Sequence, residues 1–407
     1  MASIRERAKG SYEIRVCLGY DINGKKLCKS KTWKADPNMT EKQLKKALAK
    51  AEFEFEEEIK NGKYLKGEVK FADFSKRWLT DYAEPNLSPK TTERYRELLK
   101  RINLAIGHIR LNSLKPNDLI RFYHSLSEHG KSCRKKKDKT GKVIGNQDLA
   151  PKTILHYHRL ISSMLNKAVK WQLIDENVAQ RVDPPKVPYK EAKFLDDEQA
   201  RHLILLLENE PIQYKTMIIL LIYTGIRRGE LCGLEWKDIN FKKKQLKIVR
   251  TSQCVPNIGI ITKQPKTHSS LRVIDLSDTA IILLKNYQKW QIQERFRLGD
   301  KWVDTDRLFC QWNGTPIHPD TITGWFRDFI KRNNLPKVTI HSLRHTNATL
   351  LIASGTDIRT IAGRLGHAQT STTVNTYSHV IQSANRVAAD RLDAMLNPNE
   401  QQGSKAI

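Results

Sequence analysis

The sequence lacks any apolar stretch long enough to cross a membrane. Its longest apolar run is MIILLIY at 217–223, whereas a transmembrane helix needs about 20 mostly apolar residues. The first residues, MASIRERAKGSYEIRV, contain no apolar core of a signal peptide either. We therefore expect neither a membrane span nor secretion, and we interpret residues 217–223 as a buried helix or strand.

Cysteine and acidic residues are also scarce. The six cysteines (Cys17, Cys28, Cys133, Cys232, Cys254 and Cys310) include no CxxC pair, which excludes a disulfide scaffold and a zinc ribbon and fits a reducing cytoplasm. Asp and Glu total 44 against 71 Lys and Arg, so the net charge is +27. This excess predicts a polyanionic partner, most simply nucleic acid, with an anionic membrane surface as the alternative.

The length of 407 residues suggests two or three domains, at roughly 150 residues for a typical domain. Residues 1–64 predict the first of them, a small β-sheet followed by one helix. The segment SYEIRVCLGYD alternates polar and apolar residues, and KKLCKSKTW supplies the return strand. Asn23-Gly24 between them is a strong hairpin signal. Thr40 fits a helix N-cap, with Gln43 three positions later and Gly62 as a stop.

The sheet and the helix of this segment differ in charge. Residues 1–34 carry nine basic and three acidic side chains, a balance of +6, while acids crowd the end of the helix. We interpret the sheet as facing DNA, and the alternative is a small solvated domain of mixed charge. The candidate DNA contacts are Arg15, Lys25, Lys29 and Lys31.

Residues 68–183 predict four helices that can bury a core as a bundle. Pro89, Pro116 and Pro151 each precede a stretch with helical apolar spacing. Between the third and fourth helices, residues 131–142 carry seven basic residues and one acidic residue. That segment is either a phosphate-tracking loop or a solvated hairpin. If the segment is a loop that binds DNA, its candidate contacts are Arg134, Lys135, Lys136 and Lys137.

Residues 183–193, DPPKVPYKEAK, predict an extended linker because three prolines prevent a helix there. A third domain of mixed helices and strands follows over 190–396. The tail 397–407 is expected to be flexible.

Five short polar motifs lie in the third domain: TGIRRGEL at 224–231, KQPKTHSSLRVIDL at 263–276, HSLRHT at 341–346, LGH at 365–367 and TTVNTYSHV at 372–380. Taken singly, the first fits a helix start with an Arg–Glu pair, and Tyr377 in the last fits core packing. Together they supply arginine, lysine, histidine and tyrosine, without carboxylates arranged to hold Mg²⁺. Metal-free phosphoryl transfer requires that set of side chains.

His341 and His345 also have the i, i+4 spacing of a helical zinc site. The general-base glutamate of such sites is absent from this motif, and no thiol or carboxylate cluster lies nearby in the sequence. We therefore predict no metal site, and we interpret His345 as a core histidine that donates to the backbone.

In their order and separations, the five motifs resemble the tyrosine recombinase (phage integrase) family, above all the integrases of Gram-positive temperate phages and of integrative and conjugative elements. The resemblance implies a multidomain α+β fold, mainly α with small β-sheets. Its parts would be an arm-type DNA-binding domain with a three-stranded sheet plus helix (1–64), a helical-bundle core-binding domain (68–183) and a catalytic tyrosine recombinase domain (190–396).

The resemblance also implies a role for each motif residue. Arg227 and Arg344 would clamp the scissile phosphate, and Tyr377 would attack it. His341 would hydrogen-bond the phosphate and help remove the tyrosine proton. His367 would hydrogen-bond a non-bridging oxygen or the attacked group.

A lysine on a β-hairpin would protonate the departing 5′ oxygen. The Lys-Thr pair makes Lys266 the position that matches the family. Lys263, three residues earlier, is the alternative, and strand alternation would place the two lysines on opposite faces.

The implied reaction uses no cofactor and no metal. The tyrosine attack leaves a 3′-phosphotyrosyl link, which the 5′ hydroxyl of a partner duplex then attacks. The implied partner is double-stranded DNA with core-type and arm-type attachment sites, bound by a homotetramer in the cytoplasm of a bacterial host. The outcome would be integration and excision of a phage or mobile element. The sequence leaves open whether an excision factor and a host DNA-bending protein take part, and whether the helix after Tyr377 docks on a neighbouring protomer.

The main alternative function is a catalytically silent DNA-binding regulator of the same fold, although every expected catalytic residue type is present. A type IB topoisomerase-like enzyme shares the chemistry but does not need a second DNA-binding domain. An RNA-binding protein ranks last, because neither an aromatic-rich RNP strand nor a GXXG loop is evident.

Overall fold

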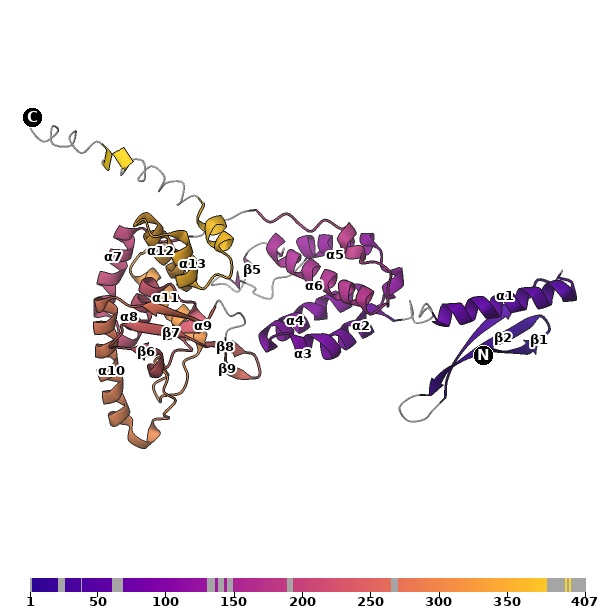
Figure 1. Cartoon of the computed structure of the whole chain (residues 1–407), viewed down its shortest axis with the longest axis horizontal. Helices are drawn as coiled ribbons and strands as arrows, with labels where there is room; N and C mark the ends of the chain where they lie inside the picture. The colour runs from indigo at the N-terminus through magenta and orange to yellow at the C-terminus, as the bar shows by residue number, and fades with distance from the viewer. Residues whose placement is uncertain are drawn as a thin grey trace, which may run out of the picture. The chain divides into compact units, whose positions relative to one another are not determined.

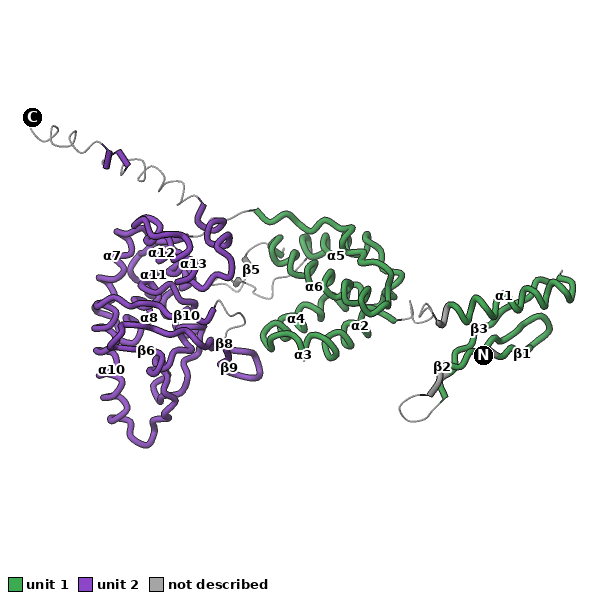
Figure 2. The backbone as a smooth tube through the Cα atoms, in the orientation of Figure 1, with its two compact units in different colours: residues 1–188 green, residues 189–407 purple. Residues whose placement is uncertain are grey.

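A computed structural model describes most of the chain, which divides into two compact units, residues 1–188 and residues 189–407 (Figure 2). The boundary falls inside the predicted proline-rich linker. The predicted tail 397–407 lies outside the described residues. The described ranges are 2–20, 26–37, 39–60, 69–129, 136–137, 143–144, 149–188, 193–264, 270–378, 392–393 and 395–396.

The first unit begins with an antiparallel sheet in the order β1-β2-β3, followed by helix α1 (Figure 1). Their bounds are Ala2–Ala8, Ser11–Tyr20, Lys26–Lys34 and Glu41–Lys60. The Thr40 N–H donates to Gln43 Oε1 over 3.0 Å, as the predicted helix start requires. Ile14 and Val16 of the sheet pack with Phe55 of the helix in a small buried core.

The rest of this unit is the predicted bundle. Helix α2 runs on through a π-helical turn, η1, into α3, and α4, α5 and α6 each begin at a proline, where a missing N–H does no harm. Phe74, Trp78 and Met164 are fully buried in the shared core. The bounds are Phe71–Trp78 (α2), Leu79–Ala83 (η1), Glu84–Asn86 (α3), Pro89–Ile106 (α4), Pro116–His129 (α5) and Pro151–Lys170 (α6).

The basic segment between α5 and α6 is described only at a short antiparallel pair, β4 (Lys136–Lys137) with β5 (Val143–Ile144). The side chains of Lys136 and Lys137, and all of Arg134 and Lys135, lie outside the described residues. The choice between a DNA-tracking loop and a solvated hairpin therefore stays a prediction.

The second unit packs helices around one very apolar helix, α8 (Ile212–Thr224). Residues 217–222 are all buried, so the longest apolar run forms a core helix, one of its two predicted structures. The unit also contains α7 (Asp197–Leu206), α9 (Arg228–Leu231), α10 (Asp278–Leu298), α11 (Pro319–Arg332), α12 (Ile340–Ala353), α13 (Ile358–Leu365) and a helical segment at 370–378.

Small antiparallel sheets complete this unit and connect the motifs. One has the order β10-β7-β6, and the other is the hairpin β8-β9. Their bounds are Ile239–Asn240 (β6), Gln245–Ile248 (β7), Thr251–Val255 (β8), Gly259–Lys263 (β9) and Arg272–Asp275 (β10).

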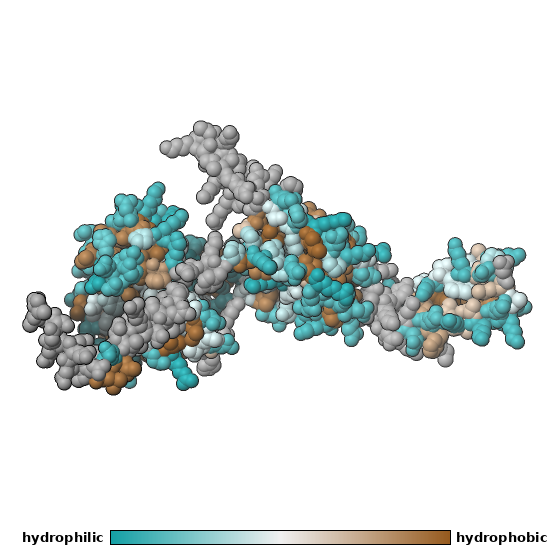
Figure 3. Space-filling model, turned by 90° about the horizontal axis from the view of Figure 1, so that it is seen from above, coloured by the Kyte–Doolittle hydropathy of each residue, from teal (hydrophilic) through white to brown (hydrophobic). Residues whose placement is uncertain are grey.

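Hydrophilic residues cover much of the face shown in Figure 3, with apolar residues between them. None of the helices in the described part of the chain has both the length and the apolar character to cross a membrane.

Candidate active site

The site begins where α8 ends. Gly225 closes that helix in the left-handed conformation, at φ +63°, which glycine adopts without strain. A Cβ at this position would lie 2.6 Å from Asn347 Oδ1. The Asn347 side chain also donates to the Ile222 carbonyl over 2.8 Å, so α12 is held against the end of α8. This close approach places Arg227, two residues after the glycine, beside the start of α12.

Helix α12 presents three motif residues from its first turns. Thr339 caps the helix by accepting the Ser342 N–H, and the Ser342 hydroxyl accepts the Thr339 N–H in return. His341, Arg344 and His345 follow on the adjoining turns. The N-terminal end of a helix favours negative charge, so these side chains lie where an anion is stabilised.

Arg344 is buried with unused hydrogen-bonding capacity. Its side chain donates from Nη1 to the Gly225 carbonyl over 2.8 Å. Its Nη2 is buried and has no hydrogen-bond partner among the described residues. Burial, with repulsion from Arg227 next, lowers the pKa of Arg344 to about 9, so the group still carries its charge at neutral pH. A buried, charged donor without a partner is costly to leave unsatisfied, and a bound anion would satisfy it.

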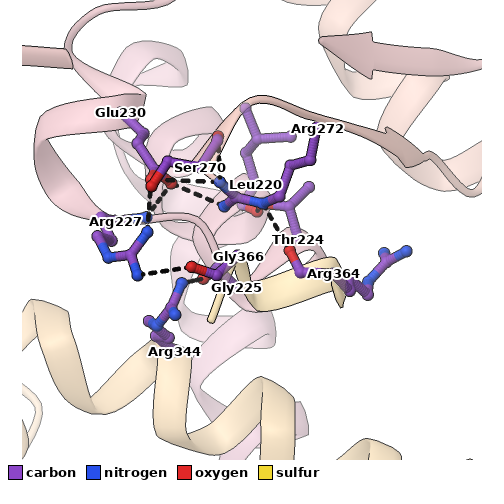
Figure 4. A network of polar contacts seen from close by, with 10 residues as sticks. All are labelled: Leu220, Thr224, Gly225, Arg227, Glu230, Ser270, Arg272, Arg344, Arg364 and Gly366. Atoms are coloured by element: carbon purple, nitrogen blue, oxygen red, sulfur yellow. Dashed lines mark hydrogen bonds and ion pairs between the residues drawn. The ribbon is translucent and has the colours of Figure 1, made fainter. Parts of the chain in front are cut away.

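Arg227 is fixed at three points. Its Nη1 donates to Glu230 Oε1 over 2.8 Å, its backbone N–H donates to Glu230 Oε2 over 2.9 Å, and its Nη2 donates to the Gly366 carbonyl over 3.1 Å. Figure 4 shows the guanidiniums of Arg227 and Arg344 reaching the carbonyls of Gly366 and Gly225. Glu230 is thus a structural partner of Arg227.

Arg228 has a different environment from Arg227. It donates to Asp320 over 2.6 Å and to Thr323 over 2.7 Å on α11. Neighbouring arginines in one motif therefore have separate partners, and Arg227 is the one beside α12.

Tyr377 and His345 are in direct contact. The Tyr377 hydroxyl lies 2.8 Å from His345 Nδ1, and the tyrosine is only 1% exposed. The His345 ring also meets His341 edge to face, with centroids 4.8 Å apart. The interpretation of His345 as a backbone donor is therefore wrong, because the helical segment 370–378 brings a phenol to its side chain.

Burial controls the protonation of this group. Burial, with His341 and Arg344 adding repulsion, lowers the pKa of His345 to about 4. Burial raises the pKa of Tyr377 to about 12, although Arg344 opposes the rise. At neutral pH the pair is a neutral imidazole beside a neutral phenol. Burial also lowers the pKa of His341, helped by Arg344 and Arg227.

His367 lies just after α13, which ends at Gly366 in the left-handed conformation. Its Nδ1 lies 2.8 Å from the Thr373 hydroxyl, which links the LGH motif to the segment that carries Tyr377. Burial and then Arg344 lower the pKa of His367 to about 4. This imidazole is also neutral at physiological pH.

Lys266 lies outside the described residues, which stop at 264 and resume at 270. The predicted β-hairpin exists as β8-β9, and Lys263 is its last residue. The choice between the two lysines stays a prediction.

The predicted DNA contacts of the N-terminal sheet do not share one face. Lys31 is opposite Ile14, and Lys29 is opposite Val16, so both lysines lie on the face that α1 covers. The Lys31 ammonium lies 5.6 Å from the centre of the Phe55 ring on that helix. Arg15 points to the other face, because successive residues of a strand alternate. Lys25 lies outside the described residues.

The arrangement suits the chemistry of a phosphodiester. Arg227 and Arg344, the latter with its unpartnered Nη2, can neutralise the non-bridging oxygens. The Tyr377 phenol can attack phosphorus, and neutral imidazoles can accept protons. In the described part of the chain, no three His, Cys, Asp or Glu residues are grouped so as to hold a metal ion.

Two models of known families match the chain. The model described as "Phage integrase family" matches residues 193–383, and "Phage integrase, N-terminal SAM-like domain" matches residues 70–127. A tyrosine recombinase described as XerC-like, from Caldanaerobacter subterraneus subsp. tengcongensis, is 26% identical over 95% of this chain and 97% of the relative.

Two solved structures share the fold. The Tn1549 transposon integrase in complex with transposon right end DNA has a TM-score of 0.65 at 20% identity, covering 80% of this chain and all of that chain. A lambda integrase tetramer bound to a Holliday junction has a TM-score of 0.52 at 17% identity, covering 90% of this chain and 96% of that chain.

Proposed function

Since the chain belongs to the phage integrase (tyrosine recombinase) family, it is a site-specific DNA recombinase that cuts and rejoins DNA strands, and we propose that the cluster around Arg227, Arg344 and Tyr377 is its catalytic centre. The observation that carries this assignment is the buried Nη2 of Arg344, which is charged and has no partner among the described residues. A scissile phosphate placed there would accept from Arg344 and Arg227 together.

In the proposed reaction the Tyr377 oxygen attacks phosphorus, and the bond from phosphorus to the 5′ oxygen breaks. The phenol proton leaves to an imidazole, with His341 assigned by the family pattern and His345 already in contact. A lysine, Lys266 by the same pattern, gives a proton to the departing 5′ oxygen. His367 would hydrogen-bond the phosphate. The 5′ hydroxyl of a second duplex then attacks the 3′-phosphotyrosyl link and releases the tyrosine.

The buried state of Tyr377 sets one requirement for this reaction. The hydroxyl is held against His345 and is almost fully shielded. The segment 370–378 must therefore shift before the oxygen can reach a phosphate.

The wider proposal concerns the partners. Residues 1–64 would bind arm-type sites, 68–183 core-type sites, and 190–396 would carry the chemistry. A homotetramer would hold two duplexes, which the likeness to the lambda integrase tetramer supports. It would integrate and excise a mobile element in the bacterial cytoplasm.

The first test is a search for the covalent link. The protein is incubated in EDTA with supercoiled plasmid that carries DNA cloned from beside its own gene. After denaturation and digestion, the nucleotide-bearing peptide is identified by mass, and the attached end is sequenced to map the cleavage site. We expect the adduct on Tyr377, absent in Tyr377→Phe. It should remain in the control Tyr223→Phe, whose tyrosine packs against the core from helix α8. Tight DNA binding without an adduct favours the silent regulator. Cleavage that EDTA abolishes, with no adduct formed, refutes the proposed mechanism.

A second test separates the DNA-binding segments. We expect removal of residues 1–64 to abolish arm-site binding and to leave core-site cleavage. Unchanged arm-site affinity in the truncated protein would refute that division.

A further inference from the structure

A buried arginine outside the catalytic set lies behind Arg227. Arg272 is the first residue of β10, and its side chain is 7% exposed. Its guanidinium donates in fork geometry to Glu230, with Nη2 to Oε2 at 2.7 Å and Nη1 to Oε1 at 3.2 Å. Such a bidentate pair fixes both partners in orientation as well as in distance.

The same guanidinium also binds two backbone carbonyls. Its Nε donates to the Arg364 carbonyl over 2.7 Å, and its Nη1 donates to the Ser270 carbonyl over 3.2 Å. Figure 4 shows Arg272 reaching toward Glu230 from one side of the network, with Arg227 on the other side. Arg272 therefore joins α9, the end of α13 and the residues just before β10.

These contacts converge on Arg227 by two routes. Glu230, which Arg272 holds, accepts from the Arg227 side chain and from its backbone N–H. Gly366, which accepts from Arg227 Nη2, lies two residues beyond the carbonyl that Arg272 binds. The fit is close, since a Cβ at Gly366 would lie 2.9 Å from Arg272 Nη1. A displacement of Arg272 would thus loosen both anchors of Arg227.

Charge gives the arrangement a second effect. Burial alone would raise the pKa of Glu230, but Arg272 and Arg227 hold it below its ordinary value, so the buried group is a carboxylate. If Arg227 alone faced that carboxylate, the negative charge would offset the charge that Arg227 offers to a phosphate. With Arg272 present, two positive charges face one negative charge, and a net positive charge remains beside the α12 N-terminus.

We infer that Arg272 is a positioning residue of the strand-cutting reaction, which orients Arg227 and neutralises Glu230 so that the Arg227 guanidinium is available to the scissile phosphate. Arg272 does not itself contact the phosphate in this inference. The inference rests on the proposed role of Arg227 as a phosphate clamp.

The test measures the cleavage rate of one DNA duplex in two chemical forms. The duplex is the one whose cleavage site the adduct experiment locates. One form has the ordinary phosphate at the scissile position, and the other has a methylphosphonate, which lacks the negative charge. The clamp stabilises negative charge, so its loss should matter for the first form and much less for the second. Because the two rates are compared within one variant, a smaller folded fraction lowers both and leaves their ratio unchanged.

The main variant is Arg272→Lys, whose single ammonium keeps the charge but cannot bind Glu230 and the Arg364 carbonyl in the same geometry. Arg272→Gln is made alongside, since its amide can still donate to Glu230. The matched control is Arg250→Lys, another largely buried arginine, which pairs with Asp238 over 2.5 Å outside this network. Arg227→Lys reports on the clamp itself.

We expect Arg272→Lys to slow single-turnover cleavage of the phosphate form about 10- to 100-fold, with a clearly smaller effect on the methylphosphonate form and unchanged DNA affinity. Arg250→Lys should change both forms by the same factor. Equal slowing of both forms by Arg272→Lys and Arg272→Gln would overturn the inference. If Arg227→Lys also slows both forms equally, the proposed clamp fails as well, so the two failures are distinguishable.

Discussion

Acid should destabilise the second unit, residues 189–407, through His345, which the fold holds neutral. The pKa of this imidazole falls from its ordinary 6.5 to about 4, chiefly because of burial, with His341 and Arg344 contributing. Between those two values the unfolded chain binds a proton that the folded chain does not. The titration of His345 therefore leaves the free energy of unfolding unchanged above about pH 6.5. It lowers that free energy progressively as the pH falls from about 6.5 toward 4.

The size of this loss follows from the same shift. At pH 5 the full difference would be worth about 2 kcal/mol. The ring is partly exposed, and solvent screening reduces the expected loss to about 1 kcal/mol. His367, whose pKa is also lowered to about 4 by burial and then by Arg344, adds a separate loss that a change at His345 leaves in place.

The assay is urea denaturation of the full chain at pH 7 and pH 5, read by pulse proteolysis and mass spectrometry of α12 peptides. His345→Gln keeps a hydrogen-bonding group near Tyr377 but does not titrate, so its stability should fall less between the two pH values than that of the parent. His202→Gln, an exposed position on α7, is the matched control. An equal fall in the parent and in His345→Gln would refute the reasoning.

Three further predictions follow from single contacts. Tyr377→Phe should lower the free energy of unfolding by about 1 kcal/mol, because His345 loses its hydrogen-bond partner; unchanged urea stability would contradict this. Gly225→Ala should destabilise the protein by at least about 1 kcal/mol, since φ is +63° and the new Cβ would lie 2.6 Å from a buried amide oxygen. Gly259→Ala, with positive φ but open space around it, should destabilise it less, and equal losses would show that the close contact is unimportant. Arg344→Lys should slow single-turnover cleavage about 100-fold with little change in DNA affinity, whereas a loss confined to affinity would place Arg344 outside the reaction.

Much of the fold could be predicted from local patterns. Prolines mark the starts of α4, α5 and α6, Thr40 marks the start of α1, and the apolar run forms the core helix α8. These signals work because helix starts and buried faces depend on residues that are close in sequence.

The features that the sequence did not predict depend on residues that are far apart in the chain. His345 meets a phenol 32 positions away, and spacing within one helix says nothing about such a partner. The Arg272 side chain is held in position by its hydrogen bonds to Glu230, which lies 42 positions earlier. The side of the sheet on which Lys29 and Lys31 lie is set by their register with β2, and a shift of one residue would reverse it.

The buried cores of the molecule use successive stretches of the chain. They draw on residues 14–55, 71–182, 195–343 and 348–377, and Tyr377 belongs to the last. Domains generally fold in order as a chain leaves the ribosome. The nascent protein can therefore complete its N-terminal sheet and helical bundle while the segment that carries the tyrosine is still being synthesised. If the N-terminal domains bind DNA and Tyr377 cleaves it, as proposed, each new molecule would be able to bind DNA before it could cleave it.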